Sequence, residues 1–507
     1  MDRGYATVGR SLRISAANYP GKTAIMEVGR GRLTYLELNA TVNRLAHYLV
    51  SKGVAKGDNV GIVMLNSIEH IALLYSLAKI GAVSVAIDPH WTAYEVARVV
   101  KHFDCNLLCV DVHLLDKLND VEASTTPKGR ILFDGKAPFL DSLGADILAQ
   151  SDVEPDVRVL DHDVFTLVLT SGTTGMPKGC MRTHRNVEMG CLKDALGKNL
   201  INTSQELIVA PIYYGTARGS VLGQIYVGGT IHVMARFEEN EVVQHIKEHQ
   251  ITDISLAPTM IHRILKLEGL QRDDFASIRS LRKVGSPFTK KMVEEIRSRI
   301  TTNIFQGFAS TESGGVTMLK PEDQLKKPGS SGHPRWGVEL QIVGPDDKAL
   351  PRGETGEIRV SGANVCEGYY KNREEQDKVF RNGWYYTGDL GWIDHDNYLY
   401  VVGRAKNMIK TGSINVAPAE IEGAILEMPE VDDCAVFGLP DEEWGEAIKA
   451  TIVLKGAAAL SAADIQAHCR KSLAGYKIPK SVVFVDSITR NPTGKVSTEF
   501  IALHRKI

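Results

Sequence analysis

Residues 170–179 read Thr170-Ser171-Gly172-Thr173-Thr174-Gly175-Met176-Pro177-Lys178-Gly179, and they directly follow the apolar run Phe165–Leu169. The glycines permit positive φ and let backbone N–H groups approach an anion closely. The hydroxyl groups and the Lys178 ammonium add further donors. It is not a Walker loop, because two residues separate Gly175 from Lys178 and no Ser or Thr follows the lysine. The run predicts a phosphate cradle at the end of a strand; a flexible surface loop is the alternative.

Outward from this loop, apolar strand-like runs alternate with amphipathic helical segments. This alternation predicts an α/β fold of mainly parallel sheets with helices on their faces, and ligands beyond the carboxyl ends of the strands. We expect strands at Val60–Leu65, Val83–Ile87, Asn106–Val110, Phe165–Thr170 and Ile254–Ala257, and helices at Glu69–Lys79, Thr92–Phe103, Glu239–Glu248 and Thr289–Ile300.

The second half of the chain has a different texture. Residues Gly332–Tyr400 contain short strands separated by Gly, Pro and Asp turns, which predicts a small β-rich unit. The remainder predicts an α+β module, with helices at Ala419–Glu427 and Ala462–Ala474 and strands at Cys434–Leu439, Ala450–Leu454 and Val482–Val485. We therefore expect a large N-terminal domain at 1–404, which includes the β-rich unit, and a small mobile C-terminal domain at 405–507. The polar segment Asp141–Asp161 is interpreted as a link between two subdomains.

Composition narrows the class of protein. A chain of 507 residues predicts two to four structural units, and a formal net charge of −2 argues against nucleic acid as a partner. The seven scattered cysteines form no C-x-x-C pair, which favours a reducing compartment over a disulfide framework. Residues Met1–Ala17 have no apolar core resembling that of a secretion signal, and the longest apolar run, Ile71–Ile87, is too short to span a membrane. We expect a soluble, cytoplasmic protein.

Four further motifs follow the glycine loop in order. They are Gly285-Ser286-Pro287, Gln306-Gly307-Phe308-Ala309-Ser310-Thr311-Glu312, Tyr386-Thr387-Gly388-Asp389 with Gly403-Arg404-Ala405-Lys406-Asn407, and Asn491-Pro492-Thr493-Gly494-Lys495. Taken singly, each motif could also be a purely structural turn, a helix cap or a solvated lysine. In this order they resemble the adenylate-forming superfamily, which comprises acyl-CoA synthetases, peptide-synthetase adenylation domains and luciferases. The resemblance covers essentially the whole chain and is nearest to the acyl-CoA synthetases.

The resemblance implies roles for these residues. Phe308 would stack on adenine, Thr311 would contact the α-phosphate, and Glu312 would hold Mg²⁺. Asp389 would accept hydrogen bonds from the ribose hydroxyls, and Lys495 would be the mobile catalytic residue of adenylation. The implied ATP- and AMP-binding set is Thr170, Ser171, Gly172, Thr173, Thr174, Gly175, Lys178, Gly285, Ser286, Pro287, Gly307, Phe308, Ala309, Ser310, Asp389 and Arg404.

Two further sites are implied in the same way. Lys406 would be the hinge between the domains, and Gly412, Ser413 and Asn415 would line the channel for pantetheine. Ser413 stands where many relatives carry a second glycine, which narrows that channel. The acyl pocket would include Tyr213, Tyr214, Gly215 and Ala309, although core packing explains the two tyrosines equally well.

The segment around Tyr214 lacks the carboxylate that peptide-synthetase domains place near it to pair an α-ammonium group. A buried ammonium without a partner is costly, so α-amino acids are disfavoured. An uncharged, fairly apolar acyl, alicyclic or aromatic group is favoured instead.

The sequence therefore predicts an ATP-dependent carboxylic acid:CoA ligase with Mg²⁺ as cofactor and ATP, CoA and a small carboxylic acid as substrates. Acyl-AMP and pyrophosphate would form first, and acyl-CoA and AMP second. The alternative is a stand-alone adenylating enzyme that loads an acyl carrier protein. Two hypotheses from other functional classes are a luciferase-like oxygenase and a non-catalytic nucleotide-binding protein. The oligomeric state stays open between a monomer and a homodimer.

Overall fold

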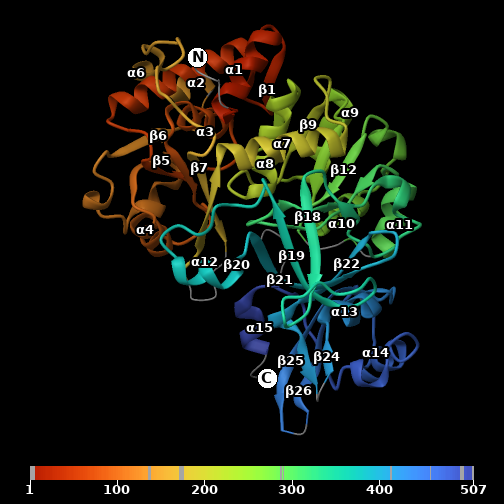
Figure 1. Ribbon diagram of the computed structural model, residues 1–507. Coiled ribbons are helices and arrows are strands. Elements are labelled where there is room, and N and C mark those ends of the chain that lie inside the picture. The colour runs from red at the N-terminus through yellow and green to blue at the C-terminus, as the bar shows by residue number, and fades with distance from the viewer. Residues whose placement is uncertain are drawn as a thin grey trace.

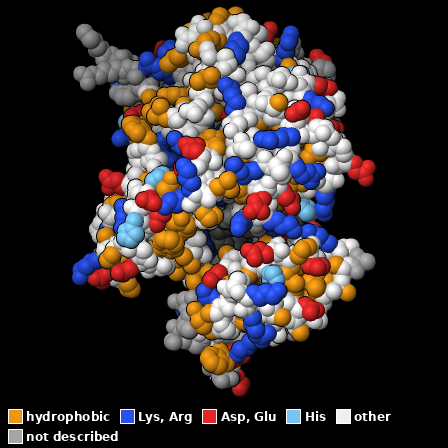
Figure 2. All heavy atoms as spheres, turned by 90° about the vertical axis from the view of Figure 1, so that its right-hand side faces the viewer, with side chains coloured by type: hydrophobic (Ala, Val, Ile, Leu, Met, Phe, Trp, Pro, Cys, Tyr) orange, Lys and Arg blue, Asp and Glu red, His pale blue; other side chains and the backbone are white. Residues whose placement is uncertain are grey.

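The computed structural model describes residues 6–134, 137, 139–170, 176–285, 288, 290–411, 414–442, 444–456, 458–490 and 496–504. A large body holds the N-terminal α/β part and an antiparallel sheet beneath it, and a small module that carries the C-terminus lies below (Figure 1). A recess separates the small module from the body in the view of Figure 2. Over the described ranges, no helix has the length and apolar character that a bilayer crossing requires.

The first sheet carries the strand that precedes the glycine loop. Its strands are parallel except for the last, and their order is β6-β5-β3-β4-β7-β8. Their bounds are β3 Asn59–Val63, β4 Val83–Ala86, β5 Cys105–Asp111, β6 Arg130–Phe133, β7 Val164–Thr170 and β8 Lys178–Thr183.

The second sheet is also mainly parallel, in the order β13-β12-β11-β9-β10-β1-β2, with only β2 antiparallel to its neighbour. Its strands are β1 Thr23–Glu27, β2 Gly31–Thr34, β9 Gln205–Ile208, β10 Thr230–Val233, β11 Asp253–Leu256, β12 Ser280–Lys283 and β13 Ile304–Phe305. The helices of this α/β part are α1 Val8–Asn18, α2 Tyr35–Ser51, α3 Ile68–Ile80, α4 Ala93–His102, α5 Phe139–Leu143, α6 Ala145–Leu148, α7 His184–Lys198, α8 Gly215–Val227, α9 Glu239–His249, α10 Pro258–Leu265 and α11 Lys290–Arg299.

Helix α3 explains the longest apolar run of the sequence. Every residue of Ile68–Ile80 is buried, so the helix is covered on all sides by protein. Ser67 caps its N-terminus by accepting a hydrogen bond from the His70 N–H, and Gly81 ends it in the left-handed conformation at φ 69°. The run forms the centre of the body.

The β-rich unit is an antiparallel sheet, β18-β19-β21-β20, with β22 added beside β21. The strands are β18 Val338–Val343, β19 Gly356–Gly362, β20 Phe380–Arg381, β21 Trp384–Ile393 and β22 Leu399–Arg404, and helix α12 Arg373–Val379 precedes β20. Two short ribbons, β14 Ala309–Ser310 with β15 Gly314–Gly315 and β16 Thr317–Met318 with β17 His333–Pro334, connect the second sheet to this unit.

The small module has its own sheet and core. The strand order is β24-β23-β26-β25, with β27 parallel to β26. The chain leaves the previous sheet at Arg404 and enters this one at Ile409. Its elements are β23 Ile409–Thr411, β24 Ile414–Val416, α13 Pro418–Leu426, β25 Val431–Asp441, β26 Gly445–Leu454, α14 Ala462–Cys469, β27 Ser481–Phe484 and α15 Thr498–His504.

The α/β class and most predicted elements agree with the structure, and two predictions are wrong. The segment Asp141–Asp161 is not a link between subdomains, because β6 before it and β7 after it belong to the same sheet. It also packs on the body, where Glu154 forms a 2.7 Å ion pair with the buried Lys79. Helix α14 ends at Cys469, not Ala474, and a turn of 3-10 helix follows at Gly475–Lys477.

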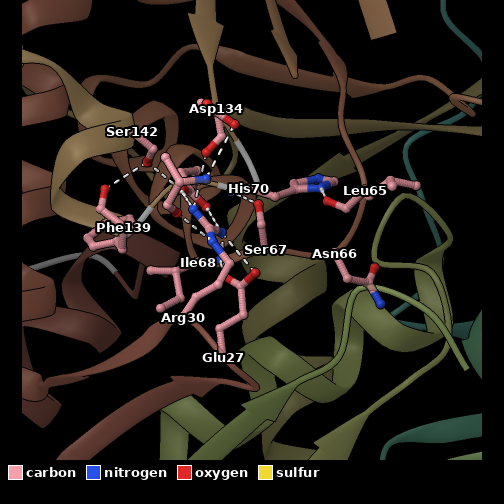
Figure 3. A network of polar contacts seen from close by, with 12 residues as sticks. Glu27, Arg30, Leu65, Asn66, Ser67, Ile68, His70, Asp134, Phe139 and Ser142 are labelled. Atoms are coloured by element: carbon pink, nitrogen blue, oxygen red, sulfur yellow. Dashed lines mark hydrogen bonds and ion pairs between the residues drawn. The ribbon is translucent and has the colours of Figure 1, made fainter. Parts of the chain in front are cut away.

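A buried ion cluster joins the β1–β2 hairpin to α3 (Figure 3). The Arg30 guanidinium lies 2.8 Å from a Glu27 carboxylate oxygen and 2.6 Å from one of Glu69, and the two carboxylate side chains are 3% and 0% exposed. Glu27 also accepts a hydrogen bond from the Ile68 N–H at 2.9 Å, and the Ser142 hydroxyl donates to Glu69. One arginine therefore compensates two buried negative charges.

We expect Arg30→Ala to lower the free energy of unfolding by about 3–5 kcal/mol, because both carboxylates would be left buried without a cation. Urea denaturation followed by circular dichroism measures the change. Arg44→Ala is the matched control: Arg44 pairs with Asp152, whose side chain is 54% exposed, and it should cost less than about 1 kcal/mol. Equal losses in the two variants would contradict a stabilising role for Arg30.

Candidate functional site

The glycine loop joins two paired strands. Strands β7 and β8 are antiparallel, and their register places Thr170 opposite Lys178, so the two ends of the loop lie side by side. Residues Ser171–Gly175 lie outside the described part of the chain. Gly179 follows Lys178, and a Cβ there would lie 2.5 Å from the Phe103 ring, so this position accepts only glycine without a shift. The loop therefore starts and ends at the carboxyl end of β7.

A short extended strip, Cys366–Tyr370, connects β8 to the Glu312 motif. The Met181 N–H donates to the Gly368 carbonyl at 2.9 Å, and the Tyr370 N–H donates to the Gly179 carbonyl at 2.9 Å. At its other end, the Cys366 N–H donates to the Glu312 carbonyl at 2.8 Å. The strip thereby fixes the spacing between the two motifs through backbone hydrogen bonds.

Tyr369, within this strip, contacts side chains of both motifs. Its hydroxyl donates a 2.8 Å hydrogen bond to Oε1 of Glu312, and Nζ of Lys178 lies 4.9 Å from its ring centroid. Burial, and then the negative charge of Glu312, raise the pKa of Tyr369 well above its usual range. The hydroxyl thus stays protonated and donates to the carboxylate.

Lys178 has a carboxylate partner. Its Nζ lies 2.6 Å from an oxygen of Glu375, in α12. Hydrogen bonds from Lys178 and then from Lys378 lower the pKa of Glu375 to about 2, so this carboxylate remains charged. Because the pair is partly exposed, the lysine can exchange this partner for a phosphate at modest cost.

Contacts with Thr317 and Arg182 hold the segment Gly307–Glu312 in place. A Cβ at Gly307 would lie 2.3 Å from the Thr317 carbonyl oxygen, so the position requires glycine. The Phe308 N–H donates to Oγ1 of Thr317 at 3.1 Å, and the half-buried ring packs against the core of the β-rich unit. Arg182 donates to the Thr311 carbonyl at 3.0 Å. The backbone of the motif is therefore rigid, while Ala309 is exposed and Ser310 is partly exposed.

Asp389 and Arg404 lie on neighbouring strands, β21 and β22, and form an ion pair with a 2.8 Å distance between Arg404 Nε and Asp389 Oδ1. Arg404 also donates to the Thr387 carbonyl at 3.0 Å. Asp389 is 6% exposed and Arg404 is partly exposed, so the pair lies at the edge of the sheet, one residue before the segment that leads into the small module. The structure brings together two residues that the resemblance places in the ATP- and AMP-binding set.

The structure describes only some of the other predicted site residues. Gly285 is exposed just after β12 with φ 75°, and Lys406 is exposed on the turn of 3-10 helix between the last strand of the body and β23. Asn415 belongs to β24. Ser286 and Pro287, Gly412 and Ser413, and the run Asn491–Lys495 lie outside the described residues.

Tyr213, Tyr214 and Gly215 form the entry to α8. The two tyrosine rings lie 4.8 Å apart, and the buried Arg218 donates to the Tyr213 carbonyl at 3.1 Å. The Tyr214 hydroxyl donates to Oδ2 of Asp88 at 2.8 Å. Burial, and then the Asp88 charge, raise the pKa of both tyrosines. The tyrosine pair is therefore packed against the core and also held in place by polar partners.

The arrangement suits Mg²⁺ bound together with a nucleotide better than a metal held by protein alone. Among the described residues, no group of three or more His, Cys, Asp and Glu could hold a metal ion. Glu312 is partly exposed. Among the described residues, only the Tyr369 hydroxyl donates a hydrogen bond to its carboxylate, at Oε1. Mg²⁺ is commonly bound by one or two carboxylates, waters and substrate phosphates, so a single glutamate suffices.

Sequence reasoning missed several residues of the site. Tyr369, Arg182 and Glu375 carry no motif, and only the fold brings them to the glycine loop and Glu312. Asp88 could have been found, since it comes directly after a buried parallel strand, where polar residues gather at the ligand-binding edge. His90, two residues further, carries the same signal.

Comparisons with known proteins agree with the motif order. The family model described as AMP-binding enzyme matches residues 12–370, and that of the AMP-binding enzyme C-terminal domain matches residues 420–495. The chain is 34% identical to a long-chain-fatty-acid–CoA ligase of Mycobacterium tuberculosis, over 96% of each chain. It is 33% identical to a feruloyl-CoA synthase of Amycolatopsis sp, over 94% of each. The ATP-bound structure of MatB from Rhodopseudomonas palustris superimposes with a TM-score of 0.92 at 26% identity, over 99% of both chains.

We expect Tyr369→Phe to weaken binding of Mg·ATP by roughly tenfold, because outer-shell partners of a metal-binding carboxylate typically contribute 10–100-fold. The ring over Lys178 remains, so only the hydrogen bond to Glu312 is lost. Isothermal titration with Mg·ATP measures the affinity. Tyr370→Phe is the control, since the hydroxyl of that neighbour binds the surface residue Asp104. If both variants bind Mg·ATP as the wild type does, the hydrogen bond has no role in the site.

Proposed function

This chain belongs to the AMP-binding enzyme family, and on that premise we propose that it is an ATP-dependent carboxylic acid:CoA ligase that works in two half-reactions. In the first, the acid and ATP give acyl-AMP and pyrophosphate; in the second, acyl-AMP and CoA give acyl-CoA and AMP. The observation that carries the proposal is the convergence of Lys178 and Glu312 on Tyr369, which joins a phosphate-binding loop to a metal-binding carboxylate.

The first half-reaction solves a leaving-group problem. A carboxylate is a poor acyl electrophile because oxide cannot leave. Attack of its oxygen on the α-phosphorus of ATP breaks the bond to pyrophosphate and makes AMP the future leaving group. Negative charge develops on the phosphoryl oxygens, so placed cations and donors contribute most to the rate.

Different residues of the body would stabilise this charge and hold the nucleotide. The loop that ends at Lys178 would hold the departing pyrophosphate, and Thr311 would contact the α-phosphate. Glu312 would hold Mg²⁺, which when bound neutralises charge on the phosphate oxygens. On the nucleoside side, Phe308 offers one face of its ring to adenine, and the Asp389 carboxylate accepts from the ribose hydroxyls beside Arg404.

The second half-reaction would follow rotation of the small module about Lys406. That residue is exposed in the three-residue turn Ala405–Asn407 between two sheets, so few contacts resist a change of its backbone angles. Rotation would withdraw Lys495 and bring the Gly412–Asn415 segment to the site, where it would guide the pantetheine arm. A carrier protein presents the same pantetheine group, which makes it the alternative acceptor.

The acid is proposed to be uncharged and fairly apolar apart from its reacting carboxylate. The relatives are named for long-chain fatty acids and for ferulate, both of which fit this description. In this chain, Tyr213 and Tyr214 present aromatic rings at the start of α8, and their hydroxyls are occupied by Asp88 and His90. The rings are thus the part of this wall that remains for an acyl group.

A panel of acids tests the proposal. With Mg·ATP, we expect pyrophosphate release to depend on a fatty or hydroxycinnamic acid, and not on α-amino acids, when octanoate, palmitate, cinnamate, ferulate, phenylalanine and leucine are compared. Thioester is then assayed with CoA and, separately, with an acyl carrier protein. Release that is fastest with an amino acid would overturn the acid class, and absence of acyl-AMP with every acid would overturn the function.

Lys495→Ala should separate the half-reactions. We expect acyl-AMP formation to fall by about 10²–10³, the usual effect of removing one transition-state cation or donor. Conversion of supplied acyl-AMP to acyl-CoA should remain within about threefold, because the lysine would have left the site by then. Lys471→Ala, an exposed lysine of the same module, is the control. An equal loss in both half-reactions would exclude this role for Lys495.

A further inference from the structure

None of the bond-making steps above uses a cluster of four side chains that lies near Thr170, where the glycine loop begins. It consists of Asp88, His90, Tyr213 and Tyr214, and we call it the Asp88–His90 cluster. Strands β4 and β7 are parallel, with Ser84 opposite Thr166 and Val85 opposite Leu167. Three residues further along, this register brings Asp88 level with Thr170, where the glycine loop begins. The cluster therefore lies at the carboxyl edge of the sheet, where the site is.

Asp88 organises the cluster through both carboxylate oxygens. Oδ1 accepts from the His90 backbone N–H at 2.9 Å and lies 2.9 Å from Nδ1 of the same residue. Oδ2 accepts from the Tyr214 hydroxyl at 2.8 Å. Asp88 is 7% exposed, so these hydrogen bonds form largely out of water. The buried carboxylate thus anchors His90 from one side and Tyr214 from the other.

The contact with Asp88 sets the tautomer of His90. A carboxylate only accepts, so Nδ1 carries the proton, and the Tyr213 oxygen lies 3.2 Å from the same nitrogen. Nε2 is then left with its lone pair. Within the described residues it has no hydrogen-bond partner, and the His90 side chain is 67% exposed. One ring nitrogen is therefore held by Asp88, and the other has an available lone pair on an exposed side chain.

We propose, building on the two-step ligase above, that His90 is the general base of the second half-reaction. As the acceptor sulfur attacks the carbonyl carbon of acyl-AMP, a C–S bond forms and the C–O bond to phosphate breaks. AMP leaves with that electron pair, and the S–H proton moves to Nε2 of His90. Asp88 is a positioning residue, because it holds the imidazole through Nδ1.

The step needs a base near neutral pH. A thiol such as that of cysteine ionises near pH 8.5, so only a few per cent is thiolate at pH 7. A positioned general base typically gives 10²–10⁴ in rate. The titratable groups that face His90 are Asp88, on its own loop, and Tyr213, from the α8 turn with Tyr214 beside it. Burial and then the Asp88 charge raise the pKa of both tyrosines, so neither takes up a proton in place of the imidazole.

The test compares His90→Asn with the wild type in each half-reaction, using the acid that gives the fastest pyrophosphate release in the panel. The asparagine amide can occupy the position of Nδ1 and keep the hydrogen bond to Asp88, but it has no basic lone pair. We expect acid-dependent pyrophosphate release to stay within about threefold of wild type. Single-turnover transfer from acyl-AMP to CoA should fall by about 10² at pH 7.

The pH profile of transfer separates a base from a structural residue. The wild-type rate should level off below pH 8.5, because a general base removes the need for the thiol to ionise by itself. In His90→Asn it should instead climb about tenfold per pH unit towards pH 8.5, where the thiol ionises by itself. In Asp88→Asn, the plateau of the transfer rate should differ from that of the wild type, because the residue that positions the imidazole has changed. The control His162→Asn changes an exposed histidine with an aspartate neighbour at the opposite end of β7, and should leave the profile unchanged.

Two results would overturn the inference: wild-type transfer kinetics in His90→Asn, or a loss of pyrophosphate release as large as the loss of transfer. Neither resembles a failure of the proposed function, which would appear in the wild type as the absence of acid-dependent pyrophosphate release. Restoration of transfer in His90→Ala by added imidazole would support the assignment, since a free base can enter the space that the side chain leaves.

Discussion

The hydrogen bond from Tyr369 to Glu312 is the contact on which the arrangement of the site depends. The glycine loop and the Glu312 motif belong to different sheets, and neither positions the other through its own strand pairing. The strip Cys366–Tyr370 closes this gap with backbone hydrogen bonds to β8 and to Glu312. Tyr369 then brings the two charged side chains to one ring, since Lys178 lies over the face of the ring and Glu312 meets its hydroxyl. The carboxylate and the lysine that we propose to bind the metal and the phosphate are thereby set at a fixed spacing.

How much of this could be predicted from the sequence depends on how local each feature is. Runs with a clear period, such as those of α3 and β7, were placed to within one or two residues, because burial on one or all faces leaves its mark in the local pattern. Glu312 and Asp389 are predicted as site residues from motif order. Tyr369 was missed, since its role arises from a pairing with β8 that no local pattern encodes. The segment Asp141–Asp161 was misread because polar, aperiodic sequence is typical both of linkers and of loops packed on a surface.

The contacts that hold the candidate site differ between the body and its boundary with the small module. On the body, Gly307 and Thr317 are in contact too close for any side chain at Gly307, and Arg182 holds the Thr311 carbonyl. Such contacts allow little displacement of this segment. At the boundary, Arg404 pairs with Asp389, while Lys406, two residues later, is exposed on a short turn. The proposed hinge therefore begins within two residues of a paired arginine at the edge of the body's sheet.

The prediction that α-amino acids are disfavoured as substrates rests on an incomplete premise. The sequence disfavoured α-amino acids because the segment around Tyr214 carries no carboxylate. The fold supplies one from elsewhere, since Asp88 at the end of β4 reaches the Tyr214 hydroxyl. However, its two oxygens already accept from Tyr214 and from the His90 backbone, and Nδ1 of His90 is within hydrogen-bond distance. An α-ammonium group would have to displace partners that hold the pocket wall in place. What argues against a cationic substrate is therefore the engagement of this carboxylate by the protein itself.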